Sequence, residues 1–266
     1  MTQQVSFFDT EQDVKSQFDA DVIEFKNKGI KAKSIFSISE ISKNVAYDFV
    51  RQYHYLGDAK FFCHKAYGLF YLPTQELVGC ATYSDVQGIV ALKGWFSLGN
   101  DTNDVYELSR LCLFPSLNGT NATSFLLGGS IKLLKKEGVC RAVVTLASSD
   151  RHVGSIYQVC NFKYFGMTDA KTDFYRADGA VNPRAKSKDA HGVWLPRARK
   201  HRYAYIFDSK LKCNYTEQPK PKTTDMTETQ CCQGTGVVFD KRFGEMYTCP
   251  RCTGEIRLLT PIKEVG

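Results

Sequence analysis

Apolar runs with strand periodicity alternate with amphipathic, helix-like runs over residues 31–210 of the chain. Seven strands and three helices are expected. In chain order they are 33–38 (strand), 40–53 (helix), 67–72 and 77–83 (strands), 106–114 (strand), 125–136 (helix), 141–147 (strand), 153–160 (helix), 165–175 (strand) and 202–207 (strand). This order predicts an α/β (α+β) fold, in which a central mixed sheet carries helices on its faces.

Two of the expected helices have recognisable ends. Ser39 is expected to cap the start of the first helix, and Ile41, Val45 and Phe49 are spaced along one of its faces. Gly138 follows the second helix and is expected to close it as a C-cap. These features fix where the chain turns between the helices and the sheet.

The most informative segment is a strand, a polar turn and a helix in succession. The strand spans 105–114, the turn at 115–124 is rich in Gly, Ser, Thr and Asn, and the helix spans 125–136. Such a segment gathers unpaired backbone N–H groups and the positive end of a helix dipole, where a diphosphate can bind. It predicts a nucleotide-like cofactor, which the segment alone does not identify.

Composition is consistent with a folded protein, because 43% of the 266 residues are hydrophobic. No run is long enough to cross a bilayer, and residues 1–28 are acidic, unlike a signal peptide. We therefore expect a cytoplasmic protein without membrane contacts, in which the cysteines are reduced. Four of them lie in apolar runs and are expected to be small buried hydrophobes: Cys80, Cys112, Cys140 and Cys160.

Composition also predicts the domain organisation. An acidic N-terminal extension (1–30) precedes the main α/β domain (31–210), which a linker (211–228) joins to a cysteine-rich module (229–266). The linker is expected because 217–228 is rich in Lys, Thr and Pro.

Most of the positive charge lies in one segment. Residues 171–203 contain nine Lys or Arg and three Asp, a net of +6 out of +7 for the chain. Aromatic residues lie between these cations, and such a mixture can contact phosphates and stack on bases. The expected DNA-binding residues are Arg184, Lys186, Lys188, Arg197, Arg199, Lys200 and Arg202. A solvated basic loop without a partner is the alternative.

The cysteine-rich module predicts structural zinc. Cys249 and Cys252 form a C-x-x-C, and the adjacent pair Cys231 and Cys232 precedes them by sixteen residues. Two such knuckles allow a short segment without a core to hold a tetrahedral metal ion. Because adjacent cysteines lack the C-x-x-C geometry, Cys213 or a histidine is a further candidate ligand; a redox-active or reduced tail is the alternative.

Polar side chains that could carry chemistry come from three segments. His54 and Tyr55 follow a predicted helix and offer a base, a metal ligand or a stacking surface, although they could equally be ordinary surface groups. Asp150 lies just beyond a strand, at the carboxyl end where α/β sheets collect ligands. Glu107 and Ser109 share one strand face and are expected to line a cleft.

Four segments in this order carry a resemblance to a known family. They are Tyr53-His-Tyr-Leu56, Glu107-Leu-Ser-Arg-Leu111, the run from Asp150 to Gly166, and Lys200-His-Arg-Tyr203. Together with the order of elements they resemble the GNAT acyltransferases and, within them, the Mom proteins of phages. The resemblance spans roughly residues 30–208 and implies a GNAT-like fold.

The resemblance implies an activity and roles for several residues. Mom-like proteins convert adenine in double-stranded DNA to N6-(carbamoylmethyl)adenine, which protects phage DNA from restriction in the host cytoplasm. The cofactor would be acetyl-coenzyme A, with Tyr157 as general acid near the thioester and with His54 and Asp150 as candidate iron(II) ligands. Contacts with the cofactor are expected from Leu111, Leu113, Asn121, Thr123, Ser124 and Asn161.

The chain departs from most GNAT enzymes in its phosphate turn. The usual Gln/Arg-x-x-Gly-x-Gly/Ala is absent, and residues 117–124 read Leu-Asn-Gly-Thr-Asn-Ala-Thr-Ser. Mom-like proteins share this irregularity. Two other functions remain open, namely a conventional GNAT N-acetyltransferase of a protein or small amine and a non-catalytic, zinc-containing DNA-binding protein.

Overall fold

The computed structural model describes residues 18, 20–26, 30–55, 57, 60–86, 89–97, 104–178, 181–182, 191–225, 235–240 and 242–259. The chain forms two compact units. Unit 1 comprises Met1–Thr145, Ser155–Tyr164 and Tyr203–Gln218, and unit 2 comprises Leu146–Gly154, Phe165–Arg202 and Pro219–Gly266. The boundary passes through three strands of the large sheet.

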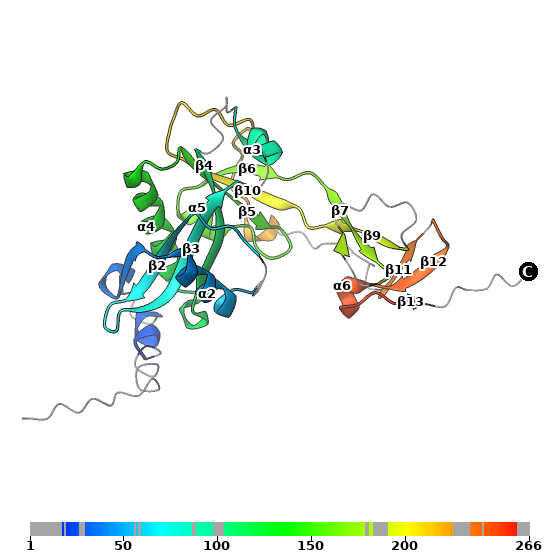
Figure 1. Ribbon diagram of the computed structural model, residues 1–266, viewed down its shortest axis with the longest axis horizontal. Coiled ribbons are helices and arrows are strands. Elements are labelled where there is room, and N and C mark those ends of the chain that lie inside the picture. Colours follow the sequence, from blue (N-terminus) through cyan, green and yellow to red (C-terminus); the bar gives the residue numbers. More distant parts are fainter. Residues whose placement is uncertain are drawn as a thin grey trace, which may run out of the picture. The chain divides into compact units, whose positions relative to one another are not determined.

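A seven-stranded mixed sheet is the centre of the fold, in the order β1-β2-β3-β4-β5-β10-β6 (Figure 1). The pairs from β1 to β4 are antiparallel, whereas β4 and β5 are parallel. The strands are β1 Phe36–Glu40, β2 Lys65–Tyr71, β3 Glu76–Asp85, β4 Val105–Leu113, β5 Ala142–Ser148, β6 Lys163–Met167 and β10 Lys200–Ile206. The predicted fold class, an α+β fold in which a central mixed sheet is flanked by helices, is confirmed.

One predicted strand is wrong. The expected strand at 165–175 is two strands, β6 and β7 (Lys171–Arg176), which belong to different sheets. Gly166 has a positive φ of 76°, a conformation that favours glycine, and the polar residues after β6 leave the sheet. The break separates β6, a strand of the large sheet, from a second small sheet.

The helices of the described chain are the short turns η1 Ala32–Ser34 and η2 Pro115–Leu117 together with α2 Lys43–Tyr53, α3 Ile89–Trp95, α4 Ala122–Glu137 and α5 Ser155–Val159. Gly138 closes α4 with a φ of 67°, as predicted. The predicted start of α2 is wrong, because Ser42 caps the helix and Ser39 belongs to β1. The buried face of α2 consists of Ala46, Phe49 and Val50, so Phe49 is buried as expected but Val45 is exposed.

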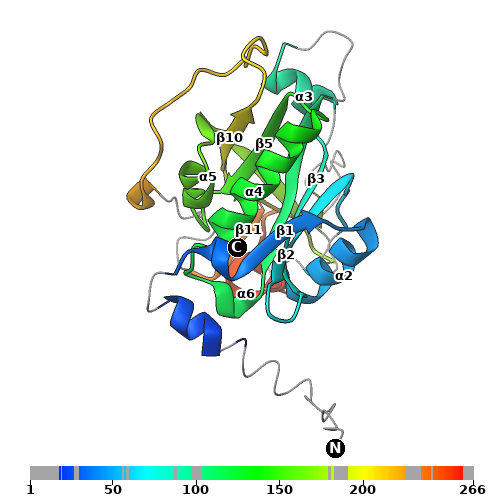
Figure 2. The same ribbon diagram turned by 90° about the vertical axis from the view of Figure 1, so that its left-hand side faces the viewer.

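Helices α2 and α4 cover opposite faces of the sheet in unit 1 (Figures 1 and 2). The α2 face packs Phe49 and Val50 against Cys80 and Cys112. On the α4 face, the buried Tyr83 hydroxyl lies 2.6 Å from the Ser130 hydroxyl. Of the four cysteines predicted to be buried, Cys80, Cys112 and Cys140 are buried and Cys160 is half-buried.

An N-terminal helical segment at 20–26 packs on the same unit. Its side of the contact is apolar: the rings of Phe18 and Tyr71 are 5.1 Å apart, and those of Phe25 and Phe36 are 5.7 Å apart. This part of the predicted N-terminal extension therefore contributes to the core of unit 1. Residues 211–218, predicted as the start of the linker, also belong to unit 1.

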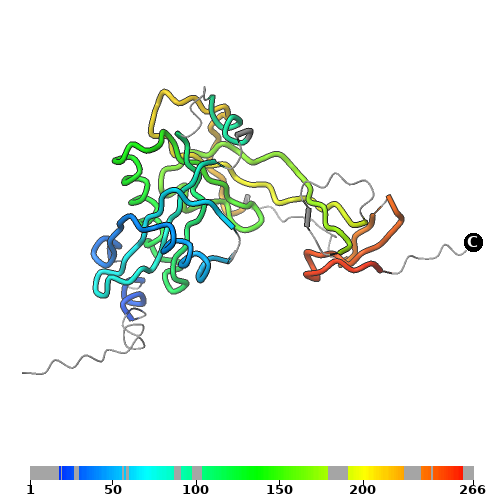
Figure 3. The backbone as a smooth tube through the Cα atoms, viewed as in Figure 1, coloured from blue at the N-terminus to red at the C-terminus, as the bar shows by residue number. Residues whose placement is uncertain are grey.

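Unit 2 contains two three-stranded sheets, in the orders β8-β7-β9 and β11-β12-β13. Strands β7 and β9 form the antiparallel pair visible in Figure 3. One hydrophobic core joins the sheets, with Tyr175 packed against it, and its buried members are Val193, Leu195, Val238, Tyr247, Cys249 and Ile256. The remaining elements are β8 Val181–Asn182, β9 Gly192–Arg197, β11 Val237–Asp240, β12 Glu245–Thr248, β13 Leu258–Leu259, η3 Thr223–Asp225 and α6 Pro250–Thr253. The described parts of the basic segment and of the cysteine-rich module thus share one hydrophobic core.

Within the described residues, no helix is both long and apolar enough to span a membrane.

Candidate functional site

Strands β4 and β5 separate after a short paired stretch. Only Val105, Tyr106 and Glu107 of β4 pair with β5, although both strands are fully described and β4 continues to Leu113. A bulge lies just beyond this point: Thr82 pairs with Arg110 and Tyr83 with Leu108, so Ser109 is the extra residue. Bulges bend and twist a strand, so this bulge helps to turn β4 away from β5. The edge of β4 then offers backbone groups that β5 does not use.

The same bulge bears on the predicted active-site face of β4. It interrupts the simple alternation from which Glu107 and Ser109 were expected to share a face. The Ser109 hydroxyl lies 2.7 Å from the Ser84 hydroxyl, and the Arg110 guanidinium lies over the Phe61 ring at 5.0 Å from its centroid.

The predicted cofactor residues on β4 lie further along the strand. Leu111 and Leu113 are half-buried and pair with Ala81 and Gly79 of β3. They therefore follow the point where β4 separates from β5. The sixth predicted cofactor residue, Asn161, is exposed, with a positive φ of 64°.

Helix α4 begins with N–H groups that its own turns do not satisfy. The first intrahelical acceptor is the Asn121 carbonyl oxygen, which receives the Phe125 N–H at 2.9 Å. The Thr120 hydroxyl accepts the Ala122 N–H at 3.2 Å, and the Thr123 and Ser124 N–H groups, both described, have no acceptor within the helix. These donors and the helix dipole favour an anion.

A pocket of about 360 Å³ lies beside this helix start. Helix residues Asn121, Ser124 and Gly128 line one part of it, and lysines line others: Lys31, Lys33 and Lys132. A Cβ added to Gly128 would meet no atom within 4 Å, so the helix surface is open there. The sequence indicated Asn121 and Ser124 as part of this site but not the lysines. Lys31 and Lys33 lie just before β1, far from α4 in the sequence, and only the folded chain brings them beside the helix.

Tyr157 is a buried phenol on α5. Its ring contacts Phe162 and Tyr203 at 5.7 and 5.4 Å between centroids. Burial raises the pKa of Tyr157, a hydrogen bond with the Thr145 side chain lowers it, and the charge of a nearby Tyr55 phenolate would raise it further. Tyr157 thus keeps its proton at neutral pH. Sequence reasoning missed Thr145, which reads as an ordinary strand residue.

His54 and Tyr55 lie at the end of α2 in unit 1. The His54 backbone N–H caps the helix by donating to the Val50 carbonyl oxygen at 2.9 Å. The rings of His54 and Tyr55 are 4.4 Å apart, and the Tyr55 side chain is 69% exposed. The imidazole and phenol therefore form one aromatic pair.

Asp150 and His152 lie in the loop after β5, in unit 2. The Asp150 carboxylate accepts the Ser148 hydroxyl at 2.7 Å, and His152 Nδ1 accepts the Gly154 N–H at 3.1 Å. Burial lowers the pKa of His152, and Arg151 lowers it further. No group of three or more His, Cys, Asp or Glu side chains suited to a metal ion occurs among the described residues. Binding of iron(II) by His54 and Asp150 stays a prediction.

Three of the predicted DNA-binding arginines form bonds inside unit 2. Arg197 Nε donates to Asp173 at 2.8 Å, Arg199 Nε donates to the Thr168 carbonyl oxygen at 2.6 Å, and Arg202 donates to the Met167 carbonyl oxygen. Lys200 is exposed, and its ammonium group contacts none of the residues that the structure describes. Arg184, Lys186 and Lys188 lie outside the described residues.

The C-x-x-C forms a tight turn at α6. Cys249 is buried at the N-cap, its N–H donates to the Gly236 carbonyl oxygen at 2.7 Å, and the exposed Cys252 donates its N–H to the Cys249 carbonyl oxygen at 3.0 Å. Cys231 and Cys232 lie outside the described residues, so the four-cysteine site stays a prediction. Cys213 belongs to unit 1, where it forms a β-bridge with Phe96.

Several solved acetyltransferases share features of this fold. A GNAT family acetyltransferase of Elizabethkingia anophelis with acetyl-CoA bound is 15% identical, with a TM-score of 0.39 over 64% of this chain and 97% of that one. A ribosomal-protein alanine N-acetyltransferase of Escherichia coli is 13% identical (TM-score 0.40; 65% and 95%). The spermidine/spermine N-acetyltransferase of Vibrio cholerae is 8% identical (TM-score 0.42; 66% and 95%).

No curated protein matches the chain. A family model gives a direct assignment. It is described as the Mom protein family and matches residues 35–222, well over half of the 266 residues. The matched region contains the sheet, the start of α4 and the aromatic pair at the end of α2. On this match, the chain belongs to the Mom protein family.

Proposed function

We propose that this protein modifies DNA by converting adenine to N6-(carbamoylmethyl)adenine with acetyl-coenzyme A as carbon donor, and so protects phage DNA from restriction. The observation that carries the proposal is the family match over 35–222, which includes all six proposed catalytic residues. They are His54, Tyr55, Glu107, Ser109, Asp150 and Tyr157.

The proposed reaction is more than acetyl transfer. Adenine N6 loses one hydrogen and bonds to the methyl carbon of the acetyl group, which also loses one hydrogen. The carbonyl carbon exchanges the coenzyme A thiolate for nitrogen from a donor at the oxidation level of ammonia. Coenzyme A leaves as the thiol. A two-electron acceptor takes up the two hydrogens that the overall reaction removes.

Acetyl-coenzyme A would bind where β4 separates from β5 and α4 begins. The free N–H groups of Thr123 and Ser124 would bind its diphosphate, and the lysines of the adjoining pocket supply further positive charge. The thiolate that leaves needs a proton. The buried Tyr157 phenol can donate one, because its raised pKa keeps it protonated until the thiolate forms.

A charge at the start of α4 tests this binding site. Ser124→Glu places a carboxylate at the third helical position, where it favours the helix dipole but repels a diphosphate. We expect acetyl-coenzyme A to bind at least about tenfold more weakly by calorimetry, while the melting temperature does not fall. Ser124→Gln is the neutral control. Equal affinity of both variants and the original chain would place the cofactor elsewhere.

Nucleoside analysis tests the activity itself. The chain is expressed in bacteria under aerobic, iron-replete growth, and the DNA is digested and examined by mass spectrometry. We expect an adenosine that carries a carbamoylmethyl group. If a protein or small amine is acetylated while the DNA stays unmodified, the chain is a conventional acetyltransferase. If the chain binds DNA but no modified nucleoside is found, it is a non-catalytic DNA-binding protein.

Two substitutions extend this test to the site. His54→Ala and Asp150→Ala should each abolish the modified nucleoside while the circular dichroism spectrum and melting temperature stay near those of the original chain. Val45→Ala is a matched control, because Val45 is an exposed residue of α2 outside the site. Undiminished modification in either variant would remove that residue from the catalytic set.

A further inference from the structure

Unit 2 contains a continuous stack of five flat side chains. The ring centroids of Trp194 and Phe174 are 5.0 Å apart, and the Arg242 guanidinium lies 5.3 Å from the centroid of Phe174. The same guanidinium lies 5.1 Å from the centroid of Phe243, whose ring stacks on His191 at 4.2 Å and an interplanar angle of 19°. Residues from β7, β9 and the β11–β12 turn thus form one aromatic and cationic ladder.

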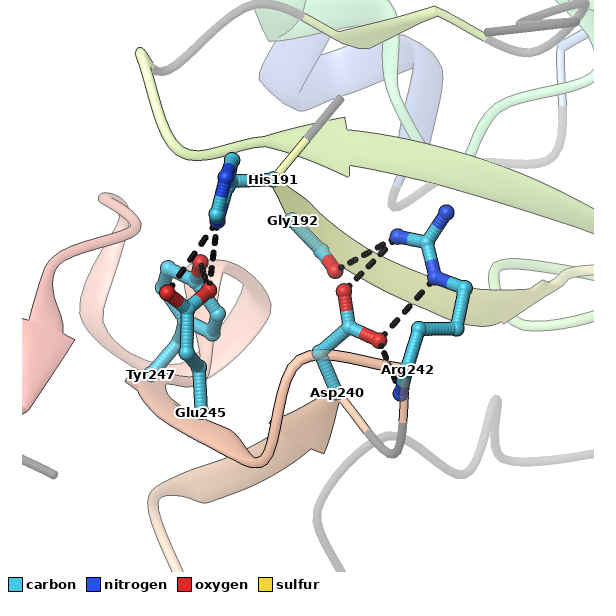
Figure 4. A network of polar contacts seen from close by, with 6 residues as sticks. All are labelled: His191, Gly192, Asp240, Arg242, Glu245 and Tyr247. Carbon is cyan, nitrogen blue, oxygen red and sulfur yellow. Dashed lines mark hydrogen bonds and ion pairs between the residues drawn. The ribbon is translucent and has the colours of Figure 1, made fainter. Parts of the chain in front are cut away.

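Ion pairs hold two steps of this ladder in place (Figure 4). Asp240 accepts Arg242 Nη2 at 2.7 Å and Arg242 Nε at 3.0 Å, and Arg242 Nη2 also lies 3.4 Å from the Gly192 carbonyl oxygen. Glu245 holds His191 at 2.9 Å and also accepts the Tyr247 hydroxyl. The Arg242 guanidinium and the His191 ring are therefore fixed in position before any ligand arrives.

The ladder is buried in the middle and open at its ends. Phe174 is fully buried, whereas Trp194 is 42% exposed and Phe243 is 39% exposed. On β9, the neighbours of Trp194, Val193 and Leu195, belong to the core of unit 2. Since side chains alternate along a strand, the Trp194 indole lies on the face opposite that core. The indole therefore covers part of Phe174 and leaves 42% of the residue's surface to solvent.

We propose that this ladder is a stacking surface for an unpaired base of DNA, with Trp194 as the residue that the base contacts. The inference rests on the proposed function, because an adenine must leave the duplex before its amine can react. Aromatic and guanidinium planes bind bases without regard to sequence. The ladder lies within or beside the segment 171–203, whose net charge of +6 suits a phosphate backbone. Arg242 contributes a cation to the ladder and Phe243 contributes a ring, and both residues lie outside the family match.

The chain provides its own optical probe. It contains two tryptophans, and the other, Trp95, is buried in unit 1 beside Tyr215. In the full-length Trp95→Phe variant, fluorescence reports Trp194 alone. A single-stranded oligonucleotide and the matching duplex with one unpaired adenine should quench this emission, and the fully paired duplex should quench it much less. Equal quenching by the paired duplex, or DNA binding seen by anisotropy without quenching, would overturn the proposal.

Substitutions give the energetic side of the test. Trp194→Ala should weaken binding of the single-stranded oligonucleotide roughly tenfold, and Trp194→Phe should restore most of it. Phe239→Ala is the matched control, since Phe239 is an exposed aromatic residue of the same unit outside the ladder, and it should bind normally. Equal loss in Phe239→Ala and Trp194→Ala would overturn a specific role for the ladder.

The result is separable from the proposed function. If the nucleoside analysis finds modified adenine while Trp194→Ala binds and modifies DNA as the original chain does, the ladder is wrong and the activity stands. If the original chain neither modifies nor binds DNA, both fail.

Discussion

Tyr157→Phe should lower the amount of modified adenine at least about 100-fold and leave the protein folded. The substitution removes one hydroxyl group and keeps the ring that packs between Phe162 and Tyr203. The fold loses the hydrogen bond with the Thr145 side chain. The reaction loses the proposed proton donor to the leaving thiolate. The measurement is modified nucleoside per unit of folded protein, under conditions where acetyl-coenzyme A is saturating.

A second phenol in the same cluster provides the control. The Tyr203 hydroxyl accepts a hydrogen bond from Gln158 Nε2 at 3.0 Å, and its ring contacts Tyr157. Tyr203→Phe removes a partly buried hydroxyl at similar structural cost, so it should retain most of the activity. If the two variants lose activity equally, Tyr157 serves as packing, as an aromatic residue on the sheet commonly does.

Cys249→Ser, or removal of metal with a strong chelator, should unfold unit 2 and release one zinc ion per chain. Cys249 is fully buried and belongs to the core that joins the two small sheets. Structural zinc contributes on the order of 10 kcal/mol to the folding of small zinc modules, far more than so small a core provides. Loss of this contribution should expose Trp194 fully to solvent. The measurements are zinc content, near-ultraviolet circular dichroism and Trp194 emission in the Trp95→Phe background.

Cys213→Ser is the control for this prediction. Cys213 was an alternative zinc ligand on sequence grounds, but it lies in unit 1 next to Phe96. This variant should keep its zinc and its unit 2 signals. A chain that contains no zinc when purified without chelator, yet shows a cooperative melting transition for unit 2, would contradict the zinc prediction.

The mixed sheet could be predicted because its strands and helices are local patterns. Each strand from β2 to β5 is a short apolar run, and Gly138 marks the end of α4 with a conformation that few other residues adopt. The order of such elements restricts the topology to few choices. The location of the candidate cofactor site could be proposed for the same reason, because the site lies on one continuous strand, turn and helix.

Other features depend on contacts that no local pattern carries. The bulge at Ser109 comes from a register shift against Thr82 and Tyr83, more than twenty residues earlier in the chain. The sequence indicated a polar middle within 165–175, but no local pattern shows that the two halves belong to different sheets. Leu195 of the basic segment and Tyr247 of the cysteine module belong to one hydrophobic core. The composition of the residues between them predicted a linker and gave no sign of this shared core.

That joint core has a consequence for the evolution of the family. The family match ends at residue 222, before β11, yet Val193 and Leu195 of the matched region are covered by residues from 238 to 256. A relative that lacks the C-terminal ribbon must either cover this face with another segment or carry polar residues at these two positions. Deleting the ribbon of this chain would expose Val193 and Leu195 to solvent, so we expect the shortened chain to aggregate rather than to form a smaller folded protein.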